Sequence, residues 1–429
     1  MGHNADPNRR YRLLQQRLDR NITGAPASPV FMQILKLLFS PEDAEIARRM
    51  PTRFISLERL SRKLAIPPDE LDEKLTDMAM RGLVIDIGQG KRRYFSLSPV
   101  VIGFFEYTFM RCRRELPMTE LARLFDDYMR KDDRFAHSVF QKETQIGRSL
   151  VREEALPEGD YMEILDWERA SRLIESATAA AVSLCACRHK ASHLGRACEA
   201  EQENCISLNI GAEILVRNHH ARKLTTAEAL RILEKSKQAG LVQTGDNVRH
   251  NVNYICNCCS CCCEMIAAIR IFNIRNAIVT SNWIMNTDLT KCAGCGRCEK
   301  ICPVGAIVIL EKQDAESRKK QALLDDKLCL GCGVCYSVCK TGAISMKPRA
   351  RRVHTPETTF DRMIAMAIER GKLADLIFAG HENLGHRALG RILSVLENSP
   401  PVKALMAIRP LRSAFFDAAV KAAKKATPL

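Results

Sequence analysis

Two stretches of the sequence decide its interpretation: CAGCGRCEKICP at residues 292–303 and CLGCGVCYSVC at residues 329–339. Each places three cysteines at intervals of three, followed by a fourth cysteine four residues later. With this spacing one tight loop offers three thiolates to a [4Fe–4S] cube, and the fourth cysteine goes to a neighbouring cube. Structural zinc sites that use only cysteine take it in two pairs. The stretches therefore predict iron–sulfur ligation rather than two zinc knuckles.

The residues around these cysteines agree with that prediction. Glycines stand between the ligands, where the backbone must turn tightly and pass close to the inorganic core: Gly294, Gly296, Gly331 and Gly333. Apolar pieces at 306–310 and 343–346 predict the strands of a small sheet. The mostly polar residues 311–321 between the two motifs predict a surface loop.

On these motifs the segment resembles a bacterial two-cluster ferredoxin, a protein that moves single electrons. The resemblance implies that the first cluster is bound by Cys292, Cys295, Cys298 and Cys339. It implies that the second cluster is bound by Cys329, Cys332, Cys335 and Cys302. Pro303 follows the ferredoxin pattern after the first motif, whereas Lys340 stands at the matching place after the second. This departure does not affect the ligands.

A second field of cysteines lies upstream and holds ten of the nineteen in the chain. They are Cys185, Cys187, Cys198, Cys205, Cys256, Cys258, Cys259, Cys261, Cys262 and Cys263. Ten thiols brought together without metal would oxidise readily and add little to packing. Four thiolates suffice for one cube, so the field predicts one or two further iron–sulfur clusters bound by a subset of these residues. Zinc and a dithiol redox centre remain the alternatives.

The strings CACRHKASHLGRACEAEQENCISL (185–208) and CNCCSCCC (256–263), ahead of a two-cluster segment, extend the resemblance. They look like a multidomain family of ferredoxin-like iron–sulfur proteins from anaerobic bacteria. The likeness covers residues 180–346 and implies electron transfer, with no substrate attached. His189 and His193 lie one helical turn apart, and we expect them to pack rather than to bind metal. Arg188 either donates a hydrogen bond to a cluster sulfur or is a surface cation.

The expected fold class is a multidomain α+β chain. Its parts are a winged-helix-like domain (1–110), a helical connector (111–180), a helical cysteine-rich cluster domain (181–287), a two-[4Fe–4S] ferredoxin domain (288–346) and a basic linker with a helical tail (347–429). In the tail, helices are expected at about 356–369, 373–379, 386–397 and 410–425. The connector contains a lone cysteine, Cys112, which we expect to be buried or inert.

The winged-helix prediction comes from two helices and a hairpin. Ser56 begins a helix over 57–65, a second helix over 69–81 ends at Gly82, and strands at 83–86 and 94–97 flank a basic loop. The second helix carries five acidic residues against Lys74 and Arg81, and such a face repels the phosphates of DNA. We therefore expect a protein-docking module rather than a DNA reader.

Composition favours a redox protein of a reducing compartment. The start of the chain is polar and lacks the apolar region of a secretory signal, and no stretch reaches the ~18 apolar residues of a membrane span. Nineteen cysteines in such a chain indicate metal or cluster binding, and we expect a cytoplasmic location. The formal net charge of +15 falls to about +11 when two clusters, each with a charge of about −2, are bound. A membrane-surface role for the last helix is less favoured than packing on protein.

The sequence therefore predicts an iron–sulfur electron-transfer protein that relays single electrons to or from a partner oxidoreductase in anaerobic metabolism. It predicts a carrier or redox subunit rather than an enzyme in its own right, since no nucleophile, paired carboxylates, dinucleotide fold or P-loop is present in the sequence. Two alternatives stay open. One is a redox- or oxygen-sensing winged-helix regulator, and the other is a reductase whose active cluster lies in the upstream cysteine domain.

Overall fold

The computed structural model of the protein describes residues 6, 8–89, 92–156, 166–314 and 317–378. Its contacts divide the chain into two compact units. The first contains the chain up to Thr108, the segment Cys112–Thr144 and the chain from Thr359 onward. The second contains Phe109–Arg111 and Gln145–Thr358. The finer division into five domains stays a prediction.

The first unit is mainly helical. Its described helices include α1 (Arg9–Asp19), α2 (Pro29–Leu38), α3 (Pro41–Arg49), α4 (Leu57–Leu64), α5 (Pro68–Met80), α7 (Met118–Asp126), α8 (Asp133–Phe140), α16 (Thr359–Glu369) and α17 (Leu373–Phe378). A small sheet has the strand order β1 (Ile55–Ser56), β3 (Arg92–Leu97), β2 (Val84–Gln89). Stacked aromatic rings fill its core: the centroids of Phe31 and Tyr128 are 4.7 Å apart.

Several local predictions for this unit are confirmed. The Ser56 side chain accepts a hydrogen bond from the Arg59 amide at the start of α4, and α5 ends just before Gly82. The hairpin strands β2 and β3 run further toward the turn than the predicted 83–86 and 94–97. Of the predicted tail helices, α16 and α17 match the first two, and those expected at 386–397 and 410–425 lie outside the described residues. Cys112 is exposed, so it is not the buried thiol that was one of the two expectations, and the other, an inert thiol, stays a prediction.

The second unit is built on a six-stranded antiparallel sheet with the order β4-β8-β9-β6-β5-β7. These strands are β4 (Gly147–Ser149), β8 (Val242–Asp246), β9 (Tyr254–Cys258), β6 (Glu203–Leu208), β5 (Ala180–Leu184) and β7 (Arg222–Leu224). The prediction of a helical cysteine-rich domain is therefore wrong. The region does contain helices, but three of its cysteines lie on β6 and β9.

One face of this sheet packs on an apolar core. Helices α10 (Ala170–Glu175), α12 (Asn209–Arg217) and α13 (Thr226–Gln238) contact the sheet or one another around it. The core includes Val182 of β5, Ile206 and Leu208 of β6, and Ile255 of β9. Since side chains alternate along a strand, Cys205 on β6 and Cys256 and Cys258 on β9 belong to the opposite face. Two further helices begin at cysteines, α11 (Ala186–His193) after Cys185 and α14 (Glu264–Phe272) after Cys263.

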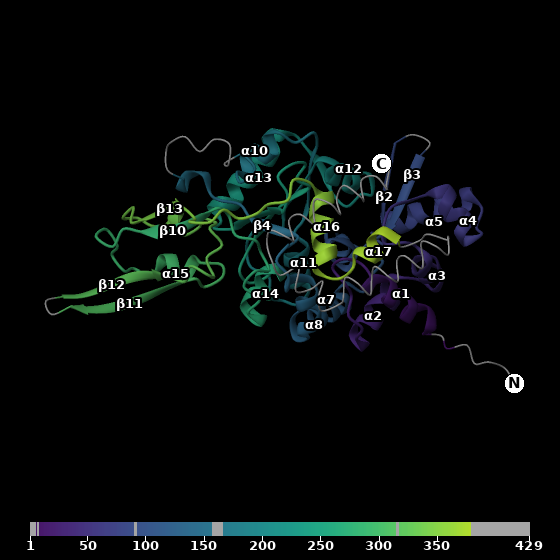
Figure 1. The fold of residues 1–429 in the computed structure, drawn as a ribbon, viewed down its shortest axis with the longest axis horizontal. Coiled ribbons are helices and arrows are strands. Elements are labelled where there is room, and N and C mark those ends of the chain that lie inside the picture. Colours follow the sequence, from purple (N-terminus) through teal and green to yellow (C-terminus); the bar gives the residue numbers. More distant parts are fainter. Residues whose placement is uncertain (1–5, 7, 90–91, 157–165, 315–316, 379–429) are drawn as a thin grey trace. The chain divides into compact units, whose positions relative to one another are not determined.

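The segment with the two cysteine motifs contains two strand pairs. Strands β10 (Trp283–Thr287) and β13 (Ile344–Pro348) are antiparallel, and a short helix, α15 (Arg297–Ile301), lies within the first motif. Strands β11 (Ile307–Asp314) and β12 (Ser317–Leu324) form a long hairpin, which Figure 1 shows beside α15.

The prediction of a surface loop over 311–321 is therefore wrong. The register runs from Ile307 opposite Leu324 to Asp314 opposite Ser317, so backbone pairing continues through the polar part of the sequence. Antiparallel pairing uses backbone groups only, and polar side chains on both faces do not prevent it.

No helix in the described ranges combines the length and apolar character needed to cross a bilayer.

The start of α13 offers a test of the local fold. The Thr225 side chain accepts a hydrogen bond from the Glu228 amide while the Glu228 carboxylate accepts one from the Thr225 amide, which is a capping box. We expect Thr225→Ala to lower the opening free energy of α13 by about 1 kcal/mol. Native-state amide exchange on α13 measures this. Thr226→Ala, at the neighbouring exposed position, is the control, and an equal loss in both variants would contradict the cap's role.

Candidate metal centres

The second cysteine motif forms a compact, mostly buried group. Cys329, Cys332 and Cys335 are each less than a tenth exposed, and their thiols interact electrostatically with one another and with Cys302 of the first motif. A pocket of about 340 Å³ of atom-free space, including its open side, is lined by these four residues and by apolar side chains such as Val304 and Met346. Burial raises the pKa of Cys332 to about 12, so the site as it stands disfavours an uncompensated thiolate. Four thiols around an apolar pocket fit the donor set of a [4Fe–4S] cluster.

The first motif is closer to the surface. Cys298 is buried on α15 and interacts with Cys292 and Cys295, of which Cys295 is exposed. Cys339, implied by the resemblance as the fourth ligand here, has its sulfur 3.6 Å from Thr341 Oγ1. Its assignment to this group stays a prediction.

The glycines of both motifs have the backbone geometry that the sequence predicts. All four have positive φ, between +61° and +76°. At Gly331 the space is closed as well, because a Cβ would collide with Trp283 O and Ser281 Oγ at the start of β10. An amide already faces a sulfur, since Ala306 N donates to Cys302 Sγ over 3.2 Å. Such N–H···S contacts are one of the means by which a protein tunes a cluster.

The upstream cysteines separate into two groups, and the smaller one has four members. The sulfurs of Cys198, Cys259, Cys261 and Cys262 all lie within 4.8 Å of one another. Cys261 and Cys262 are adjacent in sequence, and their sulfurs are 3.6 Å apart. A hydrogen bond from Cys262 stabilises the thiolate of Cys259 and lowers its pKa to about 4, against burial and with help from nearby Arg188. We call this set the four-thiol group.

The other six upstream cysteines form a second connected set, which we call the six-thiol ring. The thiol of Cys256 hydrogen-bonds to those of Cys205 and Cys258. Cys263 hydrogen-bonds to Cys258 and to Cys187. Cys185 interacts electrostatically with Cys187 and with Cys205.

The ring lies where the cysteine face of the sheet meets the N-termini of α11 and α14. Cys185 and Cys263 occupy the residue before each helix, so two helix N-termini direct partial positive charge to this region. A buried ion pair joins the two helices, with Lys190 Nζ 2.7 Å from Glu264 Oε1. A further strand contributes a hydroxyl, since Thr244 Oγ1 is 3.1 Å from Cys258 Sγ.

Arg188 lies between the two groups and is fully buried. Its Nε donates to Cys198 Sγ of the four-thiol group over 3.3 Å. Burial opposes its charge, but the nearby thiols of Cys185, Cys198 and Cys259 outweigh burial and raise its pKa. The alternative of a surface cation is therefore wrong, and the hydrogen bond to a cysteine sulfur agrees with the other alternative, in which a cluster sulfur accepts from Arg188 and which stays a prediction. His189 and His193 contact each other, since their Nε2 atoms are 3.3 Å apart. His189 Nδ1 is 2.8 Å from the backbone oxygen of Phe109.

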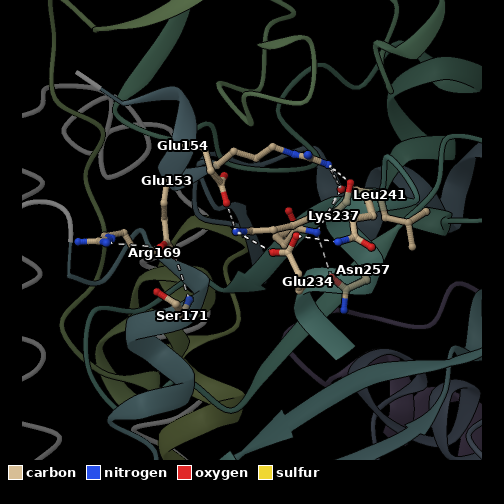
Figure 2. Close-up of polar contacts among 11 residues, drawn as sticks. Glu153, Glu154, Arg169, Ser171, Glu234, Lys237, Leu241 and Asn257 are labelled. Atoms are coloured by element: carbon tan, nitrogen blue, oxygen red, sulfur yellow. Dashed lines mark hydrogen bonds and ion pairs between the residues drawn. The ribbon is translucent and has the colours of Figure 1, made fainter. Parts of the chain in front are cut away.

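A chain of buried hydrogen bonds leads from Arg188 to the second cysteine motif. Arg188 Nη2 donates to Asn257 O (3.4 Å), and Gln243 Nε2 donates to Asn257 Oδ1 and to Leu241 O (3.1 Å each). Arg152 Nη2 donates to Leu241 O (3.3 Å), and Arg152 N donates to Cys332 O (3.1 Å). Figure 2 shows Leu241 and Asn257 within this network. The five residues before Cys332 are at most 5% exposed and Cys332 is 9% exposed, so water does not compete for these bonds.

Further polar contacts hold Arg152 and the two residues that follow it in place. Arg152 Nη2 also donates to Lys237 O over 2.8 Å, and Lys237 forms an ion pair with Glu154 (Figure 2). The neighbouring Glu153 accepts from the Ser171 amide and pairs with Arg169. The segment that carries Arg152 is thereby tied to α13 and α10.

The division of the ten cysteines was not foreseen from the sequence. A usable signal was present: Ile255-Cys-Asn-Cys258 and Asn204-Cys-Ile206 alternate in the period of a strand, which places the cysteines together on one face. Arg152, Gln243 and Asn257 gave no signal, because their role depends on contacts between distant segments.

Comparison with known proteins is consistent with this geometry. Residues 291–343 match the family model of the 4Fe-4S dicluster domain. No curated protein and no solved structure matches the chain. The chain therefore contains a dicluster segment of ferredoxin type, together with an upstream cysteine-rich region able to bind metal.

Crowding at Gly331 gives a test of the second motif. We expect Gly331→Ala to lose one cluster, about four irons per chain, because its Cβ would displace the loop from β10. Iron and acid-labile sulfide per chain, measured without oxygen, report this. Gly342→Ala is the matched control, since Gly342 also has positive φ (+63°) but open space around it. Full iron content in Gly331→Ala would contradict the close approach.

Proposed function

We propose that this protein is an iron–sulfur electron-transfer protein of anaerobic metabolism, located in the cytoplasm. It relays single electrons between the upstream cysteine region and the dicluster segment, to or from a partner oxidoreductase. The bound clusters supply the one-electron chemistry. The chain's own residues hold them, exclude water from them and connect them.

The observation that carries the proposal is the buried chain of contacts from Cys198 to Cys332. Electron transfer between fixed centres weakens steeply with the gap between them, and bonds and hydrogen bonds bridge a gap better than empty space. Arg188, Gln243 and Arg152 supply such a bridge, with successive donor–acceptor distances of 3.1–3.4 Å. Rigid, dry surroundings also keep the reorganisation of solvent small when the charge changes.

The two motifs differ in exposure, which indicates where a partner can exchange electrons. The second motif is buried and receives the contact from Arg152. The first motif has the exposed Cys295 and is the one open to solvent. A partner that exchanges electrons at the first motif is therefore supported, with the ligand assignments of both clusters as the resemblance implies. The neighbouring hairpin adds exposed apolar side chains, Val308 and Leu310, each about half exposed.

Counting electrons tests the relay. A dicluster segment alone takes up about two electrons, one per cluster. We expect the full chain, isolated without oxygen, to take up more than these in separate one-electron steps during a coulometric titration followed by electron paramagnetic resonance. Uptake of only two electrons, with metal present upstream, would show that the upstream centre is not part of a relay.

A single substitution tests the bridge itself. Gln243→Leu removes the donor to both Leu241 O and Asn257 Oδ1 while keeping a similar volume. We expect full iron content but a several-fold slower equilibration of electrons between the upstream and dicluster centres, measured by rapid mixing with reductant and freeze-quenching. Gln238→Leu, on the exposed side of α13, is the control. An unchanged rate in Gln243→Leu would remove these contacts as the connection.

Neither alternative function gains an observation in its favour. For the regulator, the wing cation Arg93 pairs with Asp72 and Asp86, and Lys74 of α5 pairs with Glu42, so these charges are engaged within the protein. For the reductase, an upstream site short of one thiolate would leave an open iron, yet the four-thiol group is complete. The identification of the N-terminal elements as a winged helix for protein docking remains part of this proposal.

The pairing of Arg93 and Lys74 with carboxylates of the protein leads to a prediction about DNA binding. We expect neither the cluster-loaded nor the metal-free chain to shift a DNA fragment specifically in gels at several salt concentrations. Specific binding with a steep dependence on salt would revive the regulator.

A further inference from the structure

The six-thiol ring has more ligands than one cube can use. In an isolated [4Fe–4S] cube each iron has one outward position, so four thiolates complete it. The four-thiol group already offers that number at a separate place, where its sulfurs lie within 4.8 Å of one another. The ring therefore cannot be explained as the surplus of a neighbouring cube.

Hydrogen bonds between thiols join five of the six members, so they do not single out a set of four ligands. These bonds join Cys205 to Cys256, Cys256 to Cys258, Cys258 to Cys263 and Cys263 to Cys187, and Cys185 interacts electrostatically with Cys187 and Cys205. Three members, Cys205, Cys258 and Cys263, are less than a tenth exposed. Two spare reactive thiols against a cluster in such a site would invite oxidation.

Burial opposes negative charge at the ring and raises the pKa of Cys185, but several fixed groups offset part of this cost. Two helix N-termini meet the ring, and the fully buried guanidinium of Arg188 lies on the side of Cys185. The Lys190–Glu264 pair between α11 and α14 adds no net charge. A cluster with six thiolates needs more compensation than a cube with four, and these fixed groups contribute to it.

From this arrangement we propose that the six-thiol ring binds one iron–sulfur cluster larger than a cube. Its ligands are Cys185, Cys187, Cys205, Cys256, Cys258 and Cys263. Two cubes joined through a shared sulfur have three outward irons on each half, which makes six positions for six thiolates. Each thiol gives up one proton on binding, as for any thiolate ligand. The four-thiol group then binds a cube of its own.

This inference deepens the cofactor part of the proposed function, but it does not depend on where electrons go. Its test reads metal content and spectra, whereas the relay is tested by electron counts and rates. A relay could therefore fail while the ring still binds the larger cluster, and the reverse also holds.

The first measurement is iron per native chain, isolated without oxygen. We expect about twenty irons: about eight in the dicluster segment, about four in the four-thiol group and about eight in the ring. About sixteen would mean a cube in the ring and would overturn the proposal, as would zinc at the ring. Mössbauer spectra check the assignment, because irons at the junction of two cubes differ from those of isolated cubes.

The second measurement replaces each ring cysteine by serine in turn. If all six are ligands, each of the six variants alters the spectrum of the large cluster. If any two variants leave iron content and spectrum unchanged, the ring holds a four-ligand cube and the proposal is wrong. Cys261→Ser, in the exposed part of the four-thiol group, is the matched control and should alter only the spectrum of that group's cube. Unchanged spectra of the dicluster segment in each variant exclude general misfolding.

Discussion

The alternation of side chains along β6 and β9 is the constraint on which the rest of the upstream region depends. The same strands supply Ile206 and Ile255 to an apolar core and Cys205, Cys256 and Cys258 to the opposite face. A shift of register by one residue would exchange the two sets and place thiols in the apolar core. The packing of α10, α12 and α13 on one face therefore also fixes where the thiols of the other face lie.

Buried arginines offset part of the cost of placing negative charge on these buried thiols. Thiols collected away from water disfavour the negative charge that metal binding requires, and a fully buried cation offsets part of that penalty. Arg188 does this between the two upstream groups. Beside the second motif, burial lowers the pKa of Arg152, and the nearby Cys332 and Cys335 oppose that shift. Both guanidiniums also use their several donors on backbone carbonyls, so one side chain serves both charge and position.

The sequence predicted what depends on neighbours in the chain. The cysteine spacing identified the dicluster segment, and short capping signals located α4 and α13. It did not predict the β11–β12 hairpin, because polar residues such as Glu311 and Lys320 hide strand pairing that rests on the backbone. It did not divide the upstream cysteines either. Cys198 belongs with Cys259, and Cys187 with Cys263, through contacts across more than sixty residues of chain, which no local pattern encodes.

The separation of the cysteines along the chain also affects how each site forms. Each dicluster motif brings three of its cysteines together within seven residues, so such a loop is nearly complete as soon as it is synthesised. The ring draws on residues from Cys185 to Cys263 and exists only after β5, β6 and β9 have paired. Closing contacts of that length is slow, and a metal site made of them is coupled to folding itself. The formation of the ring is thus tied to the folding of the sheet, whereas the three-cysteine loops of the dicluster segment depend on local sequence.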